Sequence, residues 1–207
     1  MAIAGKSASL AKLVARRVRD WELASSQREH EGQRAASVAG PYVSISRAIG
    51  SHGRIVATRL AERLHWQYYE REIVEYIAKR AQVREAVVKS LGETRRDELE
   101  NWVSAMIDSQ ALPETAYVRH LVAVLTAIAA HGDVVILGRG AQFILPPAGG
   151  LRVRLVAPHG HRVRAAMEDY GISEAEAGKL INDSDRAQAR FYRSRFGRDA
   201  TTPSRTT

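Results

Sequence analysis

The feature that most constrains the fold is a short strand-like run followed by a glycine turn. This combination occurs twice in the chain. Residues 42–46 form a β-branched run, residues 50–53 supply a turn, and residues 54–64 carry apolar side chains at helical spacing. Residues 134–137 form a continuous apolar run that leads into a second turn at residues 138–140. Such a run is typical of a strand buried on both faces of a parallel sheet. We therefore expect βαβ units and an α/β fold.

The rest of the chain supplies the other layers of this fold. Further strands are predicted over residues 66–69 and 151–157. A capping box formed by Ser173 and Glu176 marks the start of the last helix. Helices are predicted over residues 70–81, 83–111 with a break at Gly92, 113–131 starting at Pro113, 159–170 ending at Gly171, and 173–195.

Residues 1–39 are expected to be an N-terminal helix and linker, ahead of a domain at residues 40–207. Apolar residues recur at helical spacing between Leu10 and Trp21, and the polar stretch of residues 25–39 is predicted to be the linker. An arginine-rich, acid-poor start also describes a mitochondrial transit peptide. The helical pattern continues into acidic sequence, so we favour a helix that docks on the domain or on a partner.

Composition narrows the class of partner. The formal net charge of +8 and the pI of about 10.1 favour anionic partners, such as nucleotides, nucleic acid or acidic membrane surfaces, although a solvated basic surface is an equal alternative. No apolar run approaches the ~20 residues of a membrane span, so we expect no membrane partner. The absence of cysteine excludes a disulfide framework and fits a cytoplasmic protein. The seven histidines show no metal-ligand spacing, so no metal site is assigned.

The first glycine turn is a candidate phosphate site. A helix that starts directly after a strand offers unpaired backbone N–H groups and the positive end of its dipole. The residues concerned are Gly50, Ser51, His52, Gly53 and Arg54. The chain has no Gly-Lys pair followed by Ser or Thr, so the common phosphate-loop pattern is not matched. A tight turn without any ligand is the alternative.

Arginines supply the second set of candidates. Arg139 lies in the second turn, which a parallel sheet places at the same edge as the first, and it could hold a phosphate bidentately or point to solvent. The last two predicted helices carry more arginines, which could close over a triphosphate or form a solvated basic face. These are Arg162, Arg164, Arg186, Arg190, Arg193 and Arg195, of which Arg186, Arg190 and Arg193 share one helical face.

The order and spacing of these segments resemble the cytidylate kinase-like family, a branch of the nucleoside monophosphate kinases. The resemblance rests on residues 20–24, 44–47, 50–54, 66–72, 135–141, 151–158, 170–173 and 185–196. It implies a three-layer P-loop kinase-type fold with a parallel sheet and a helical lid over about residues 159–196. The family continues with a further strand, which residues 200–207 do not resemble. We therefore expect the final strand to be missing and the edge beside residues 151–157 to be exposed.

The resemblance also implies an activity, the transfer of the γ-phosphoryl group of ATP to CMP or dCMP with the help of Mg²⁺. Residues 50–54 would then bind the ATP phosphates, and Arg47 and Arg139 would hold the monophosphate. The catalytic candidates, which would stabilise charge on the transferred group, are Arg54, Arg162, Arg186 and Arg190.

Four positions depart from the family pattern. Gly53 stands at the usual lysine and Ile55 at the usual magnesium-binding hydroxyl, while His52 replaces a glycine and Glu70 an aspartate. A non-catalytic nucleotide-binding regulatory protein on the same fold is therefore kept as an alternative. A basic nucleic-acid-binding module is a weaker alternative, because aromatic residues are only 6% of the chain and no stacking platform is visible. Homo-oligomers could form through the N-terminal helix or the exposed sheet edge.

Overall fold

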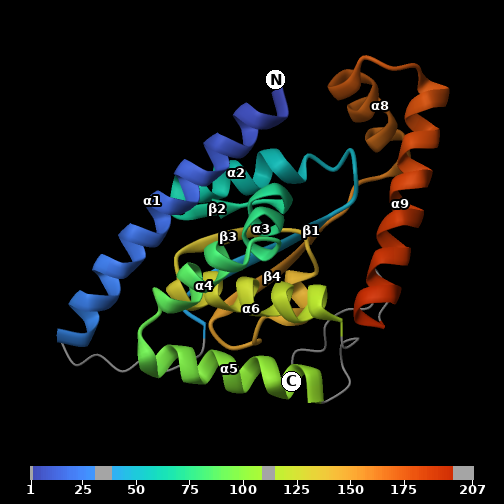
Figure 1. Ribbon diagram of the computed structural model, residues 1–207. Coiled ribbons are helices and arrows are strands. Elements are labelled where there is room, and N and C mark those ends of the chain that lie inside the picture. Colours follow the sequence, from blue (N-terminus) through green and yellow to red (C-terminus); the bar gives the residue numbers. More distant parts are fainter. Residues whose placement is uncertain (1, 31–38, 109–114, 198–207) are drawn as a thin grey trace.

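A four-stranded parallel sheet lies at the centre of the molecule (Figure 1). The structure is a computed structural model that describes residues 2–30, 39–108 and 115–197. The strands are β1 (Tyr42–Arg47), β2 (Gln67–Tyr69), β3 (Val134–Leu137) and β4 (Gly150–Leu155), in the order β2-β3-β1-β4. All three pairings are parallel, which confirms the predicted α/β fold.

The helices follow the predicted order with three differences. The predicted break near residues 81–83 lies slightly earlier, between Ala78 and Ala81, a short helix follows the second glycine turn, and the predicted start at Pro113 lies outside the described residues. The predicted break at Gly92 is confirmed. The helices are α1 (Ala2–His30), α2 (Gly53–Leu64), α3 (Arg71–Ala78), α4 (Ala81–Lys89), α5 (Glu93–Asp108), α6 (Ala116–His131), α7 (Ala141–Ile144), α8 (His159–Tyr170) and α9 (Glu174–Phe196).

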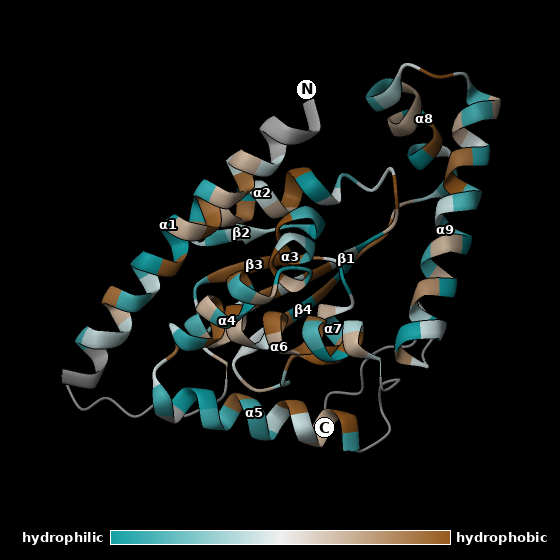
Figure 2. Cartoon of the chain, viewed as in Figure 1, coloured by the Kyte–Doolittle hydropathy of each residue, from teal (hydrophilic) through white to brown (hydrophobic). Residues whose placement is uncertain are grey.

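Two apolar cores cover the two faces of the sheet. The larger one joins the sheet to α3, α4 and α6, and Leu121, Leu125 and Ile128 of α6 are fully buried in it. The smaller one packs Ala57 and Ala61 of α2 against the other face. Two cores form because successive side chains of a strand point to opposite faces of the sheet, and each face is covered by the apolar side of a helix. Figure 2 shows the hydrophobic colour of β3 at the centre of the molecule and mixed hydrophobic and hydrophilic residues along the surrounding helices.

Helix α1 docks on the domain beside β2. Val14, Val18 and Trp21 are buried, and the Trp21 ring stacks on the His131 ring at 3.9 Å between centroids. The Arg17 Nη2 group donates a hydrogen bond of 3.0 Å to the backbone oxygen of Tyr68. The predicted linker is wrong over residues 25–30, because α1 continues to His30. Ser25 is buried as well, so the contact of α1 with the domain reaches into the predicted linker.

Strand β4 ends the sheet within the described residues, so the predicted exposed edge is present there. Leu151 at this edge is 61% exposed. Residues 200–207, which the sequence indicates are no further strand, lie outside the described residues. Self-association through this edge or through α1 stays a prediction.

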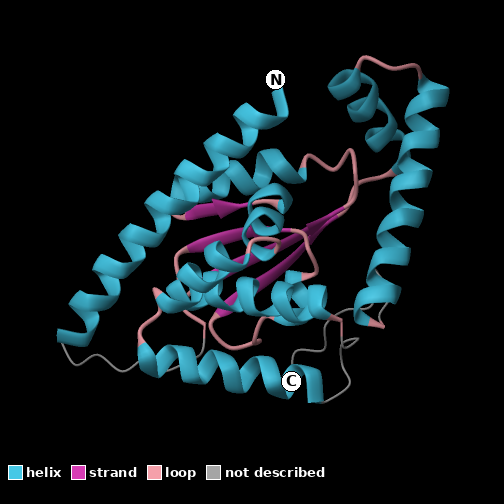
Figure 3. Ribbon diagram, viewed as in Figure 1, coloured by secondary structure: helices cyan, strands magenta, loops and turns pink. Residues whose placement is uncertain are grey.

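Helices α8 and α9 form a pair beside the carboxyl ends of the strands, joined by a short loop (Figure 3). The predicted capping box is confirmed, since Glu176 N–H donates to Ser173 Oγ and Ser173 N–H donates to Glu176 Oε2. Val163 and Ala166 of α8 pack with Ile181 of α9, and Ile49 of the first glycine turn packs against this cluster. The helical pair is therefore anchored to the first glycine turn.

Candidate functional site

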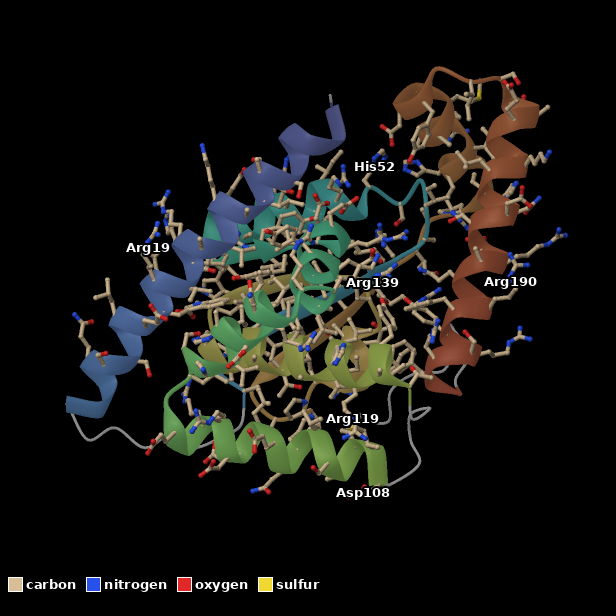
Figure 4. All side chains as sticks on the ribbon, viewed as in Figure 1. Arg19, His52, Asp108, Arg119, Arg139 and Arg190 are labelled. Atoms are coloured by element: carbon tan, nitrogen blue, oxygen red, sulfur yellow. The ribbon has the colours of Figure 1, made fainter. Side chains whose placement is uncertain are left out.

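A pocket of about 420 Å³ lies at the carboxyl ends of β1 and β3 and is bordered by α9. Three arginines line it: Arg47 at the end of β1, Arg71 at the start of α3, and Arg139 in the second glycine turn. Its volume is in the range of ordinary small-molecule sites. Aromatic side chains also line it, namely Tyr170, Phe191 and Tyr192. Figure 4 shows Arg139 between the sheet and α9.

The second glycine turn directs Arg139 to this pocket through an unusual backbone. Gly138, Arg139 and Gly140 all have positive φ, of 85°, 55° and 74°. An arginine in this region is strained by roughly 1–2 kcal/mol, so the surrounding packing has to hold it there. Part of that packing is the Phe196 ring, which would lie 2.2 Å from a Cβ atom added to Gly140. The end of α9 thus fixes the shape of the turn.

The Arg139 guanidinium is held by Glu75 and Tyr117, which do not line the pocket, and by Phe191, which does. Its Nη1 donates to Glu75 Oε1 at 2.6 Å and to the Tyr117 hydroxyl at 3.4 Å, and it lies over the Phe191 ring at 4.9 Å. Burial alone would raise the pKa of Glu75, but the charge of Arg139 and the hydrogen bonds from Lys79 and Arg71 outweigh it and lower that pKa. Glu75 is therefore ionised at neutral pH. The Nε of Arg139 is buried and has no hydrogen-bond partner among the described residues.

Arg47 connects the two glycine turns. A Cβ atom on Gly53 would lie 2.6 Å from Arg47 Cβ and Cγ, and one on Gly138 would lie 3.3 Å from Arg47 Nη1. The side chain thus runs from the start of α2 to the second turn. In the described part of the chain its guanidinium has no ion pair or hydrogen bond. The arginine occupies part of the space in front of α2 and carries an uncompensated charge into the pocket.

Arg71 is the pocket residue that sequence reasoning missed. Its Nε donates to Glu75 Oε1 at 3.1 Å. It lies within residues 66–72, a segment that carries the family resemblance, but its spacing from Arg139 offers no local signal. The structure therefore brings the predicted Arg47 and Arg139 together and adds Arg71.

The first glycine turn lies apart from this pocket, because none of residues 50–54 lines it. The turn packs tightly: a Cβ on Gly50 would lie 2.5 Å from the backbone oxygen of Arg162, and Ser51 Oγ donates to Ala48 O at 2.7 Å. His52, at φ 54°, is the N-cap of α2 and provides no side-chain cap. Val56 N–H bonds to the His52 carbonyl, so the earlier amides of α2 are the ones open to an anion.

Arg54 at the start of α2 is directed toward the end of β2. Its Nη2 lies 2.9 Å from Glu70 Oε2, and its side chain is 67% exposed. The Tyr68 hydroxyl also donates to Glu70, at 3.4 Å. Burial and the charge of Glu70 raise the pKa of Tyr68 to about 12. The Glu70 carboxylate thus links the first turn to β2.

The predicted lid arginines have different positions. Arg162 is buried, and its Nη1 and Nη2 pair with Asp185 at 2.9 and 2.7 Å while its Nε donates to Ile49 O at 2.7 Å. Arg186 and Arg190 are exposed on the face of α9 opposite the residues that line the pocket. Figure 4 shows Arg190 on the outer side of α9. In this conformation the Arg162 guanidinium is bound to Asp185 and to the Ile49 carbonyl, whereas Arg186 and Arg190 do not line the pocket.

The residues around the first turn do not fit a Mg²⁺ ion, which prefers oxygen ligands. Ile55 has no oxygen in its side chain, and the Ser51 hydroxyl donates to a carbonyl. Glu70 and Asp185 are both paired with arginines. Within the described ranges there is no group of three or more His, Asp or Glu side chains that could hold a metal.

Comparisons with known proteins agree with this architecture. The chain is similar to an uncharacterised protein from Eubacterium ventriosum of known crystal structure, with a TM-score of 0.51 and 17% identity over 78% of this chain and 83% of that one. This likeness shows a shared fold alone. No curated protein matches. No helix in the described ranges is both long and apolar enough for a membrane crossing. A sequence model described as the cytidylate kinase-like family matches residues 42–206, so the chain belongs to that family, which has a kinase-like, nucleotide-binding fold.

Proposed function

We propose that this protein transfers the γ-phosphoryl group of ATP to CMP or dCMP. The observation that supports this most is the convergence of Arg47, Arg71 and Arg139 on one pocket at the carboxyl ends of the strands. Open parallel sheets bind ligands at this edge. Family membership suggests kinase-like chemistry and the use of ATP in general.

The arginine pocket is proposed to hold the acceptor nucleotide. Guanidinium groups bind phosphate through paired N–H donors, and three of them offset the two negative charges of a monophosphate. The aromatic side chains of Tyr170 and Phe191 border the same pocket. They would offer an apolar surface for the base beside the arginines that would bind the phosphate.

The first turn, residues 50–54, is proposed to bind the ATP phosphates, with the open amides at the start of α2 as donors. Arg47 runs between the two turns and would lie between donor and acceptor phosphates. Arg54, Arg162, Arg186 and Arg190 are the proposed sources of charge stabilisation during transfer. Arg186 and Arg190 would act only after α8 and α9 move, because both lie on the outer face of α9. We propose no residue as a ligand of Mg²⁺.

A coupled assay of ADP release tests this function with CMP, dCMP, UMP and AMP as acceptors. We expect turnover with a cytidine nucleotide and a loss of roughly 10- to 150-fold in kcat/KM for Arg139→Ala, since a hydrogen bond to a charged group is worth about 1.5–3 kcal/mol. Arg63→Ala, an exposed arginine near the end of α2, is the matched control and should keep full activity. Absence of ADP release with every acceptor would exclude the kinase.

A non-catalytic nucleotide-binding regulatory protein is the second candidate, and one observation favours it. The start of α2 offers Gly53 and the 46% exposed Ile55 where the family usually has an amine and a hydroxyl. Calorimetry with ATP and with CMP separates the two candidates. Binding of either nucleotide without turnover favours the regulator, and the absence of any binding excludes both.

A further inference from the structure

We propose that Glu75 is a positioning residue that holds Arg71 and Arg139 side by side for an incoming phosphate. The inference rests on the proposed function only in taking the arginine pocket as a phosphate site. Glu75 lies on α3 and does not itself line the pocket, whereas the two arginines that it contacts do. It would therefore act through them and not on the ligand itself.

One carboxylate oxygen joins the two guanidinium groups. Glu75 Oε1 accepts from Arg139 Nη1 at 2.6 Å and from Arg71 Nε at 3.1 Å. The other oxygen, Oε2, accepts from Lys79 Nζ at 3.2 Å. The side chain of Glu75 is 19% exposed and that of Arg139 is 14% exposed, whereas that of Arg71 is 62% exposed, so the Arg139 side of this junction is the one shielded from water. A shared acceptor fixes the relative orientation of two long side chains that are otherwise free to separate.

Charge gives the second reason for this assignment. Arg71 and Arg139 both bind the same oxygen of Glu75, so their like charges lie close together and repel each other. The ionised Glu75 is the carboxylate paired with both Arg71 and Arg139 in the described part of the chain. It offsets their repulsion while the pocket keeps a net positive charge.

The arrangement leaves donors for a ligand. A guanidinium has five N–H donors. Arg71 gives its Nε–H to Glu75, so its two Nη groups stay available. Arg139 gives only Nη1 to Glu75 and Tyr117 among the described residues. Glu75 thus engages the arginines without consuming the donors that a phosphate needs.

Titration calorimetry with CMP tests the inference on the full chain with Glu75→Ala, Glu75→Gln and the control Glu72→Ala on the same helix. We expect at least a tenfold weaker Kd for Glu75→Ala and substantial rescue by Glu75→Gln, because its amide oxygen can still accept from both arginines. Glu72→Ala should bind as the unchanged chain does. If Glu75 acted only as a nearby negative charge, removing it would strengthen CMP binding, and unchanged or tighter binding by Glu75→Ala overturns the proposal.

A second measurement needs no nucleotide and separates this inference from the proposed function. NMR of the arginine side chains reports how freely each guanidinium rotates. Slow rotation of Arg71 and Arg139 in the unchanged chain should become fast in Glu75→Ala, with Arg47 as the internal reference. Equal rotation rates in both proteins overturn the positioning role. A chain that binds no CMP but shows this change loses the proposed function and keeps the inference.

Discussion

The two glycine turns lie at the same edge of one sheet, yet they present different chemical groups. After β1, the turn leads into α2, a helix of twelve residues whose first amides are not capped by a side chain. After β3, three consecutive residues with positive φ lead into α7, which has only four residues. The first turn offers backbone donors and a helix dipole, whereas the second offers the side chain of Arg139.

Packing explains this difference. The first turn is fixed from outside by α8, through the contact of Gly50 with the Arg162 backbone. The second turn is fixed by the Phe196 ring above Gly140 and by the ion pair between Arg139 and Glu75. The same local motif, a strand followed by a glycine turn, thus presents backbone amides in one case and an arginine side chain in the other. The helices packed against each turn determine which group is presented.

Gly140→Ala should have the largest effect, because it disturbs the second turn directly. We expect a loss of about 3 kcal/mol in the free energy of unfolding, from a strained left-handed backbone (roughly 1–2 kcal/mol) and overlap with Phe196 (roughly 1–3 kcal/mol). Urea denaturation measures it. Gly171→Ala is the control, since Gly171 has a similar φ of 63° with nothing within 4 Å, and should lose only about 1 kcal/mol. Equal losses would show that the Phe196 contact does not hold the turn.

Asp185→Asn should have an intermediate effect confined to the first turn. It leaves Arg162, whose side chain is 10% exposed, without its charged partner. We expect a loss of about 1–2 kcal/mol, below that of a fully buried pair because Asp185 is 44% exposed. The exchange of backbone amide hydrogens with solvent should become faster at residues 50–53 than in the unchanged chain, and should not change at residues 138–140. Asp183→Asn on the same exposed stretch of α9 is the control, and similar changes in both variants would argue against the Arg162 contact.

Arg54→Ala should have the smallest effect on stability. Its own side chain is 67% exposed and solvent screens the ion pair with Glu70, so we expect a change of no more than about 0.5 kcal/mol. The affinity for ATP should fall a few-fold because a cation near the first turn is lost, while the affinity for CMP stays unchanged. Calorimetry with each nucleotide measures this. An equal loss for both ligands would mean that the two turns do not bind separate ligands.

Much of the fold was predictable because its signals are local. The apolar run of β3, the glycine after α8 and the capping box of α9 each depend on residues close together in the chain, and all three are present. The break between α3 and α4 was predicted near residues 81–83 and lies slightly earlier, at residues 79–80, because helical spacing continues across these two residues.

The candidate site was predictable in part. Arg139 was identified because it follows a strand whose end lies at the ligand-binding edge, and Arg47 because it lies in a segment that carries the family resemblance. Arg71 and Glu75 were not identified. The contact between Glu75 and Arg139 joins residues 64 positions apart in the sequence, and no local pattern indicates it. The common face of Arg186 and Arg190 follows from helical periodicity, but periodicity does not say whether that face turns toward the pocket.

The sequence by itself determined that parallel strands would end in two glycine turns at one edge, because strand and turn propensities act over a few neighbouring residues. Only the tertiary structure decided which arginines share a pocket and which carboxylate holds them. Those contacts depend on how α3 and α9 pack against the sheet, and packing joins residues that no local pattern relates.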